Sequence, residues 1–145
     1  MSESRILVID ADAPRAERLA GLLEFMDLTP RWVASAGDVD VRRARPHDWL
    51  AVVVGSLDDK KATDGFFAWL GKAQLPPPVL LLEGDTAAFA AAHGLHEAGV
   101  WTLESPIRHA QLEACLRRAS LKRLDTEHQA QQVTTSGPTG NSPAV

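Results

Sequence analysis

Residues 6–12 of this chain read ILVIDAD, and the structural interpretation of the whole sequence starts from them. Four aliphatic residues in a row are too few for a helix and are typical of a strand buried on both faces. Asp12 stands where a helix N-cap is expected, and Pro14 suits the first turn of that helix. The apolar stripe of the predicted helix comprises Leu19, Leu22, Leu23 and Met26.

Four more short apolar runs follow, and segments with helical spacing lie between them. The alternation of strand and helix predicts right-handed βαβ units and a mostly parallel sheet, although this pattern does not give the strand order. The additional strands are expected at residues 31–34, 50–54, 79–82 and 100–103. The additional helices are expected between Ser35 and Pro46, around residues 66–70, after a cap at Asp85, and from Ser105 and Pro106 to about His128.

The composition fits one compact domain of 145 residues, 45% of them hydrophobic, with a formal net charge of −4. The chain has more acidic than basic residues and therefore lacks the excess of positive charge that nucleic-acid binding requires. We expect this chain to bind no nucleic acid. No apolar stretch is long enough to span a membrane and no signal peptide is present, which predicts a cytoplasmic protein. Cys115 is the single cysteine, and its place in an apolar helical stripe predicts a buried, reduced thiol.

The composition changes near the end of the chain. Residues 129–145 read QAQQVTTSGPTGNSPAV, which is poor in large apolar residues and rich in Ser, Thr, Gly and Pro, as flexible linkers are. We therefore expect a globular domain over residues 1–124 and a helix end with a flexible tail over residues 125–145. A chain that stops inside a linker hints at a further domain downstream.

Four segments together resemble the receiver domains of bacterial two-component regulators. They are ILVIDAD, then AVVVGS at residues 51–56, PVLLLEG at residues 78–84, and Ser-Pro ahead of the final helix. The resemblance covers about residues 4–124. It implies a flavodoxin-like, CheY-like α/β fold: a three-layer sandwich around a five-stranded parallel sheet in the order 2-1-3-4-5.

The resemblance also identifies the positions at which receivers carry their chemistry. Receivers bind Mg²⁺ through an acidic pair after the first strand and accept phosphate on an aspartate after the third. A hydroxyl residue follows the fourth strand, and a lysine after the fifth holds the phosphoryl oxygens. In this sequence Asp10 matches the first acid, Ala11 replaces the second, Ser56 the acceptor, Glu83 the hydroxyl residue and Ser105 the lysine.

These replacements remove the groups that a phosphoaspartate needs, since its nearly two negative charges must be offset by a metal and a cation. We expect Asp10, Asp12 and Glu83 to form a remnant acidic pocket, with Glu104 nearby and no basic partner. Like charges about 4 Å apart cost on the order of 4 kcal/mol at an effective dielectric near 20. We therefore expect no phosphorylation, no bound metal and no cofactor. The alternative register makes Asp58 the acceptor.

Loss of both acceptor and lysine, with VVVGS in the third strand, resembles the N-terminal domain of the FleQ family of flagellar regulators. The resemblance implies a regulatory and dimerisation domain of a sigma-54-dependent transcription activator, followed by an AAA+ module and a helix-turn-helix DNA-binding domain. A homodimer is expected. A stand-alone receiver-like adaptor remains the alternative. No GxGxxG, GxxxxGK, HExxH or GxSxG pattern occurs, so we expect no enzymatic activity. The predicted interface residues are Trp101, Leu112, Leu116 and Leu121.

Overall fold

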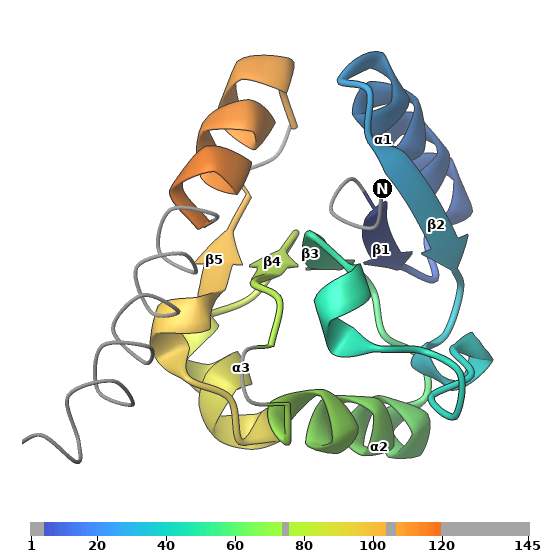
Figure 1. Cartoon of the computed structure of the whole chain (residues 1–145), viewed down its shortest axis with the longest axis vertical. Helices are drawn as coiled ribbons and strands as arrows, with labels where there is room; N and C mark the ends of the chain where they lie inside the picture. The colour runs from blue at the N-terminus through green and yellow to red at the C-terminus, as the bar shows by residue number, and fades with distance from the viewer. Residues whose placement is uncertain (1–4, 74–75, 104–106, 120–145) are drawn as a thin grey trace, which may run out of the picture.

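The computed structural model describes residues 5–73, 76–103 and 107–119 of the chain. In these residues a five-stranded parallel sheet has the order β2-β1-β3-β4-β5, with helices on both of its faces (Figure 1). The five predicted strands and the strand order implied by the resemblance are confirmed. The strands are β1 (Arg5–Ile9), β2 (Thr29–Val33), β3 (Ala51–Val54), β4 (Val79–Leu81) and β5 (Val100–Thr102).

The helices begin where short polar side chains cap them. Asp12 caps α1 by accepting a hydrogen bond from the backbone N–H of Arg15, as predicted, and Asp85 caps α3 in the same way. The α2 helix is longer than the sequence predicted, because Asp59 caps it well before the aromatic residues. The helices are α1 (Ala13–Phe25), α2 (Lys60–Gly71), α3 (Thr86–His93), the short η4 (Glu97–Gly99), and a helical segment over residues 109–119.

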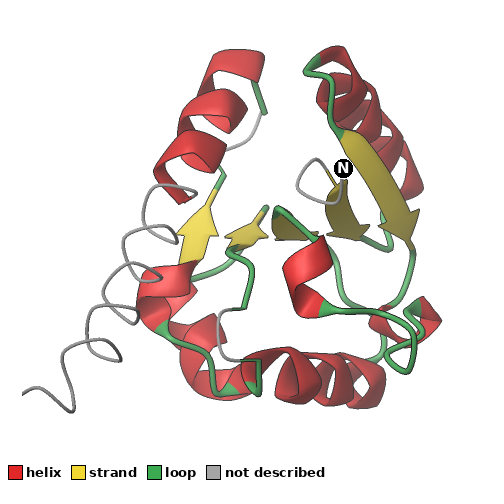
Figure 2. Cartoon of the chain, in the orientation of Figure 1, coloured by secondary structure: helices red, strands yellow, loops and turns green. Residues whose placement is uncertain are grey.

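The predicted helix between Ser35 and Pro46 is wrong. The segment between β2 and β3 contains only two short 3-10 helices, η2 (Ala36–Asp38) and η3 (Pro46–Asp48) (Figure 2). The side chain of Asp40 accepts a hydrogen bond from the backbone N–H of Arg42, a local turn that competes with a helix. The apolar face of this segment is thin, so packing it against the sheet would not offset the unfavourable free energy of nucleating a helix.

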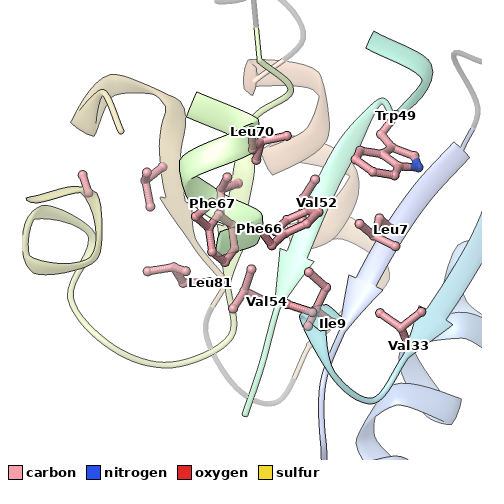
Figure 3. Close-up of a cluster of buried hydrophobic side chains, with 14 residues drawn as sticks. Leu7, Ile9, Val33, Trp49, Val52, Val54, Phe66, Phe67, Leu70 and Leu81 are labelled. Carbon is pink, nitrogen blue, oxygen red and sulfur yellow. The ribbon is translucent and has the colours of Figure 1, made fainter. Parts of the chain in front are cut away.

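Strand residues alternate between two apolar clusters, one on each face of the sheet. On the face covered by α2 and α3, Leu7, Ile9 and Val52 pack against Phe66 and Phe67 (Figure 3). The opposite face packs against α1 and the helical segment 109–119. Burial on both faces explains why the aliphatic stretches of β1, β3 and β4 are unbroken, whereas the edge strand β2 is largely exposed. The members of the second cluster with the least exposure are Ile6, Val8, Ala16, Leu23, Ala51, Val53, Leu80 and Leu112.

The helical segment 109–119 uses its apolar stripe inside the domain. Leu112 is 0% exposed and Leu116 6%, so these two predicted interface residues belong to the core, because both pack on the sheet. Cys115 is buried in the same cluster as predicted, and burial raises the pKa of its thiol. Trp101 is only half-buried. The predictions for Leu121, for the start of this helix at Ser105 and Pro106, and for the tail lie outside the described residues.

His93, at the end of α3, lies between aromatic rings. Its ring centroid is 5.1 Å from that of Phe67 and 4.5 Å from that of Phe89. Its buried Nδ1 has no hydrogen-bond partner among the residues that the structure describes, and lies 3.5 Å from Oδ1 of Asp64. Burial lowers the pKa of His93, because the charged imidazolium is poorly solvated there, although the Asp64 carboxylate opposes this effect.

None of the described helices is long and apolar enough to cross a membrane.

Candidate functional site

The candidate site lies at the carboxyl ends of three neighbouring strands. Asp10 directly follows β1, Ser56 follows β3, and Glu83 follows β4. Two backbone hydrogen bonds hold the first two loops together: Gly55 N–H donates to the carbonyl of Ile9 at 2.8 Å, and Ala11 N–H to that of Ser56 at 2.9 Å. The parallel sheet thus brings together residues that are far apart in sequence, at the edge where open α/β sheets bind ligands.

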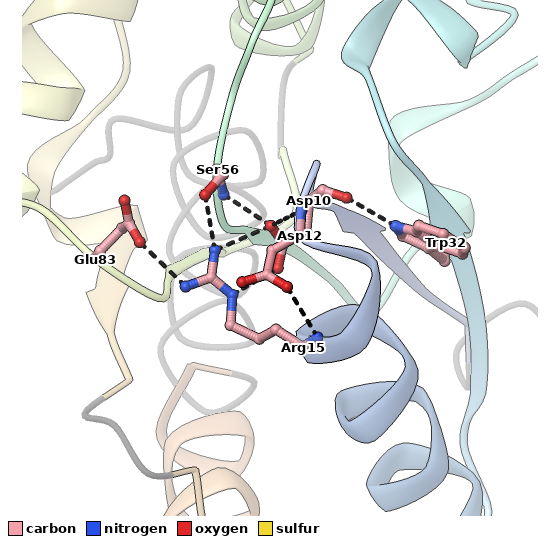
Figure 4. A network of polar contacts seen from close by, with 6 residues as sticks. All are labelled: Asp10, Asp12, Arg15, Trp32, Ser56 and Glu83. Atoms are coloured by element: carbon pink, nitrogen blue, oxygen red, sulfur yellow. Dashed lines mark hydrogen bonds and ion pairs between the residues drawn. The ribbon is translucent and has the colours of Figure 1, made fainter.

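Asp10 is the buried centre of this site, with a fully buried side chain. Its Oδ1 accepts hydrogen bonds from the backbone N–H groups of Asp12 at 3.0 Å and Ser56 at 2.9 Å. Its own carbonyl oxygen accepts a hydrogen bond from Nε1 of Trp32 at 2.8 Å. Asp10 is therefore a structural junction between the turn after β1, the turn after β3, and the edge strand β2 (Figure 4).

Arg15 supplies the positive charge of the site. Its Nε lies 2.7 Å from Oδ2 of Asp10, and its Nη2 lies 2.9 Å from Oδ1, which makes a bidentate ion pair. Nη2 also donates to Oγ of Ser56 at 3.1 Å, while Nη1 donates to Oε2 of Glu83 at 3.1 Å. One side chain thus joins the turns after β1, β3 and β4 (Figure 4). We call Asp10, Arg15, Ser56 and Glu83 the Asp10 site.

The expectation of an acidic pocket without a basic partner is therefore wrong. The carboxylates of Asp10 and Glu83 are brought close together as expected, but the Arg15 guanidinium lies between them. The side chain of Asp12 acts instead as the cap of α1 and contributes its backbone N–H to Asp10. A signal for Arg15 was available: side chains in the first turn of a helix lean toward the N-terminus, so a long one reaches back to the strand ends.

The pKa shifts of Asp10 and Arg15 have the directions expected of a close ion pair. Burial by itself would raise the pKa of Asp10, but hydrogen bonds from Arg15, Asp12 and Ser56 and the charge of Arg15 outweigh burial and lower it. The pKa of Arg15 is raised, chiefly by its hydrogen bond to Asp10, against the effect of burial and with further help from Glu83. Both groups are therefore charged throughout the neutral range.

Gly55 is required by the close approach of Asp10. A Cβ atom at position 55 would lie 2.3 Å from Cγ of Asp10 and 2.5 and 2.6 Å from its carboxylate oxygens. Such distances are far inside van der Waals contact, so any larger residue would displace the carboxylate. The glycine of the VVVGS stretch thus makes room for the Asp10–Arg15 pair.

The residues present do not fit the Mg²⁺ that receivers use. Mg²⁺ requires oxygen ligands in octahedral geometry, usually one or two carboxylates. Here the side chain of Ala11 offers no ligand atom, both oxygens of Asp10 already accept hydrogen bonds, and a guanidinium lies 2.7 Å from one of them. Across residues 5–73, 76–103 and 107–119, no group of three or more His, Cys, Asp or Glu side chains is arranged to hold a metal ion.

The other sequence candidates lie away from these contacts. Asp58, the alternative acceptor, is exposed two residues beyond Ser56, and its neighbour Asp59 caps α2. Ser56 itself occupies the position that faces Asp10 and Arg15. Ser105, which stands in place of the receiver lysine, and Glu104 lie outside the described residues.

A parallel sheet in the order β2-β1-β3-β4-β5 with helices on both faces, and an aspartate at the end of β1, defines this chain as a receiver-like domain. The family model described as "Flagellar regulatory protein FleQ" matches residues 5–121. The chain therefore belongs to the FleQ family. No match was found among curated proteins.

Solved structures support the fold. The receiver domain of a histidine kinase from Syntrophus aciditrophicus matches with a TM-score of 0.58 and 20% identity, over 82% of this chain and 91% of that one. A CheY-like receiver domain from Methylobacillus flagellatus has a TM-score of 0.58, 19% identity and coverages of 80% and 98%. An adenylate cyclase structure from Rhodopirellula baltica has a TM-score of 0.61, 19% identity and coverages of 91% and 97%. At these identities the likeness establishes the fold alone.

Proposed function

We propose that this chain is a regulatory receiver-like domain that accepts no phosphoryl group and acts through contacts with other proteins. The observation that carries the proposal is the position of Arg15, whose guanidinium contacts Asp10, Ser56 and Glu83 at once. A true receiver neutralises its acidic cluster with a metal when it is phosphorylated. Here the Arg15 guanidinium already contacts both carboxylates of that cluster and offsets one of their two negative charges, which leaves less negative charge for a metal to balance.

The chemistry of the individual residues supports the same proposal. Ser56 has no carboxylate with which to form an acyl phosphate, and its hydroxyl oxygen accepts a hydrogen bond from Arg15. The guanidinium beside Asp10 would repel Mg²⁺, since two cations about 4 Å apart oppose each other even in a polar environment. The Arg15 contacts also hold α1 to the turns after β3 and β4, which favours one fixed arrangement over a phosphorylation switch.

Membership in the FleQ family supports a proposal about the larger protein. We infer that the domain belongs to a cytoplasmic, sigma-54-dependent regulator of flagellar genes, with AAA+ and helix-turn-helix domains, and that it supports homodimer formation. This proposal assigns no catalytic activity to the chain. Because Leu112 and Leu116 are in the core, Trp101 on the edge strand β5 is the remaining predicted contact among the described residues. A reading frame that ended with this domain would favour the stand-alone adaptor instead.

Phosphorylation is tested directly by incubating the protein with acetyl phosphate and Mg²⁺ and measuring its intact mass. We expect no gain in mass, and a phosphoryl adduct on the wild-type chain would contradict the proposal. An Asp58→Asn variant, measured in parallel, reports on the alternative acceptor. If the wild type gained mass and this variant did not, Asp58 would be the acceptor.

Self-association is tested by sedimentation velocity over a concentration series. We expect a dimer whose dissociation constant increases in a Trp101→Ala variant. Phe25→Ala is the control, since Phe25 is an exposed aromatic residue at the end of α1, away from β5. A strictly monomeric wild type at high micromolar concentration, or an equal effect of both variants, would remove the proposed dimer contact.

A further inference from the structure

A second feature lies at the other end of the sheet, where β1 and β2 begin. A cavity of about 630 Å³ opens there, bounded by the first residues of these strands and by the segment between β2 and β3. Its lining carries four arginines and two aspartates, so it has an excess of two positive charges in a chain whose net charge is −4. The charged residues that line this arginine cavity are Arg5, Arg31, Asp40, Arg43, Arg45 and Asp48.

The cavity exists because the segment between β2 and β3 forms only two short turns. Arg31 precedes Val33 by two residues, and Arg5 precedes Leu7 by two, so both arginines lie on the face of the sheet that α2 and α3 cover elsewhere. A helix at residues 36–48 would require apolar residues at these positions. The chain has arginines there instead, opposite a loop that contributes two more.

The positive charge of the cavity is only partly balanced within the domain. Asp40 lies 3.7 Å from Nε of Arg43, an exposed pair that contributes little. In the part of the chain that the structure describes, Arg5, Arg31 and Arg45 make no ion pair. Clustered cations repel one another, so an anion that entered the cavity would relieve this repulsion as well as form its own contacts.

Arginine is the residue best suited to phosphate, because its planar guanidinium donates two parallel hydrogen bonds to phosphate oxygens. The arginines approach from two sides, the strands and the loop, which favours a ligand with more than one anionic group. The wall also includes the apolar Val39, Ala44 and Trp49, and the volume lies in the range of small-molecule sites. We propose that the arginine cavity binds a small anion with two phosphate groups, of the nucleoside diphosphate class.

Isothermal titration calorimetry of the 145-residue chain at low ionic strength tests this proposal, with ADP, inorganic pyrophosphate and adenosine as probes. We expect ADP to bind saturably with one molecule per chain, pyrophosphate to bind more weakly, and adenosine not to bind. A double Arg31→Gln, Arg45→Gln variant should lose about tenfold or more in ADP affinity. The matched control is Lys61→Gln with Arg108→Gln, which removes the same charge from exposed positions outside the cavity.

The outcomes separate a built site from general attraction between charges. Absence of saturable ADP binding below about 1 mM, or an equal loss of affinity in the control variant, would overturn the proposal. Circular dichroism establishes that each variant is folded. If the double variant is not, Arg45→Gln alone, in the loop, provides the comparison and should still weaken ADP binding. ADP binding to the arginine cavity does not depend on whether the Asp10 site accepts a phosphoryl group, because the arginine cavity and the Asp10 site lie at opposite ends of the strands. The two proposals can therefore fail separately.

Discussion

The Arg15–Asp10 ion pair should stabilise the domain measurably, and an Arg15→Ala variant tests it. Asp10 is fully buried, and the variant removes two charged hydrogen bonds from its carboxylate. Breaking a buried pair by removing one partner typically costs about 3 to 5 kcal/mol. Two features reduce this value here: Asp10 keeps two backbone N–H donors, and water can enter where the partly exposed Arg15 side chain had been. We therefore expect a loss of about 2 to 3 kcal/mol at pH 7.

The pH dependence gives the experiment a sharper signature. In the wild type the pKa of Asp10 lies below its usual value of 3.8, so its stabilising effect is present above pH 3.8 and is lost as the pH falls through the lowered pKa. Without Arg15, burial raises the pKa of Asp10 with less opposition. The buried carboxyl is then protonated, and better tolerated, at a higher pH. The difference in stability between the two proteins should therefore shrink as the pH falls from 7 toward 4.

Urea unfolding followed by tryptophan fluorescence, at pH 7 and at pH 4, measures both effects. Arg18→Ala is the matched control, because Arg18 is an exposed arginine on the same helix. Arg15→Lys keeps the charge but loses the bidentate contact, and should fall between the wild type and Arg15→Ala. The reasoning would be refuted if Arg15→Ala and Arg18→Ala agreed within about 0.5 kcal/mol at pH 7, or if the loss in Arg15→Ala were the same at both pH values.

Three further changes probe the surroundings of the site and the core. Gly55→Ala should cost more than about 2 kcal/mol, because its Cβ would lie 2.3 Å from Cγ of Asp10. Gly21 lies in a helix with open space around it, so Gly21→Ala should instead raise the free energy of unfolding by about 0.5 to 1 kcal/mol in the same urea assay. Equal changes in stability in the two variants would contradict the predicted clash at position 55. Trp32→Phe should lower stability by about 1 kcal/mol in thermal unfolding, since it removes the hydrogen bond to the Asp10 carbonyl; an unchanged melting temperature would show that this bond contributes nothing. Burial lowers the pKa of His93 below 6.5, so the stability of the wild type should fall as the pH drops below 6.5 and level off below the lowered pKa. His93→Leu should flatten this pH dependence. Identical slopes in the two proteins would show that His93 does not cause it.

The candidate site was partly predictable from the sequence. Asp10, Ser56 and Glu83 each follow an aliphatic run, and parallel strands bring their carboxyl ends to one edge of the sheet. The cap at Asp12 was predictable for a similar reason, since it depends only on neighbouring residues. The role of Arg15 was missed, because its contacts depend on how a long side chain crosses from α1 to two other loops.

The predicted helix between Ser35 and Pro46 and the predicted interface at Leu112 and Leu116 were wrong for related reasons. Both predictions assumed that an apolar pattern shows where a segment packs. The thin pattern before Pro46 was too weak to form a helix, and its absence opened the arginine cavity. The stripe on the segment 109–119 was strong, but the sheet already covers it.

The sequence by itself determined the five strands, the helices that follow β1, β3, β4 and β5, and the helix caps at Asp12 and Asp85, because these depend on local patterns of apolar and polar residues. Only the tertiary structure decided that Arg15 reaches Ser56 and Glu83, that Gly55 makes room for the Asp10 carboxylate, and that arginines gather where β1 and β2 begin. Those features arise from residues distant in the chain. Their distances are set by how the layers pack, and no local pattern of residues encodes that packing.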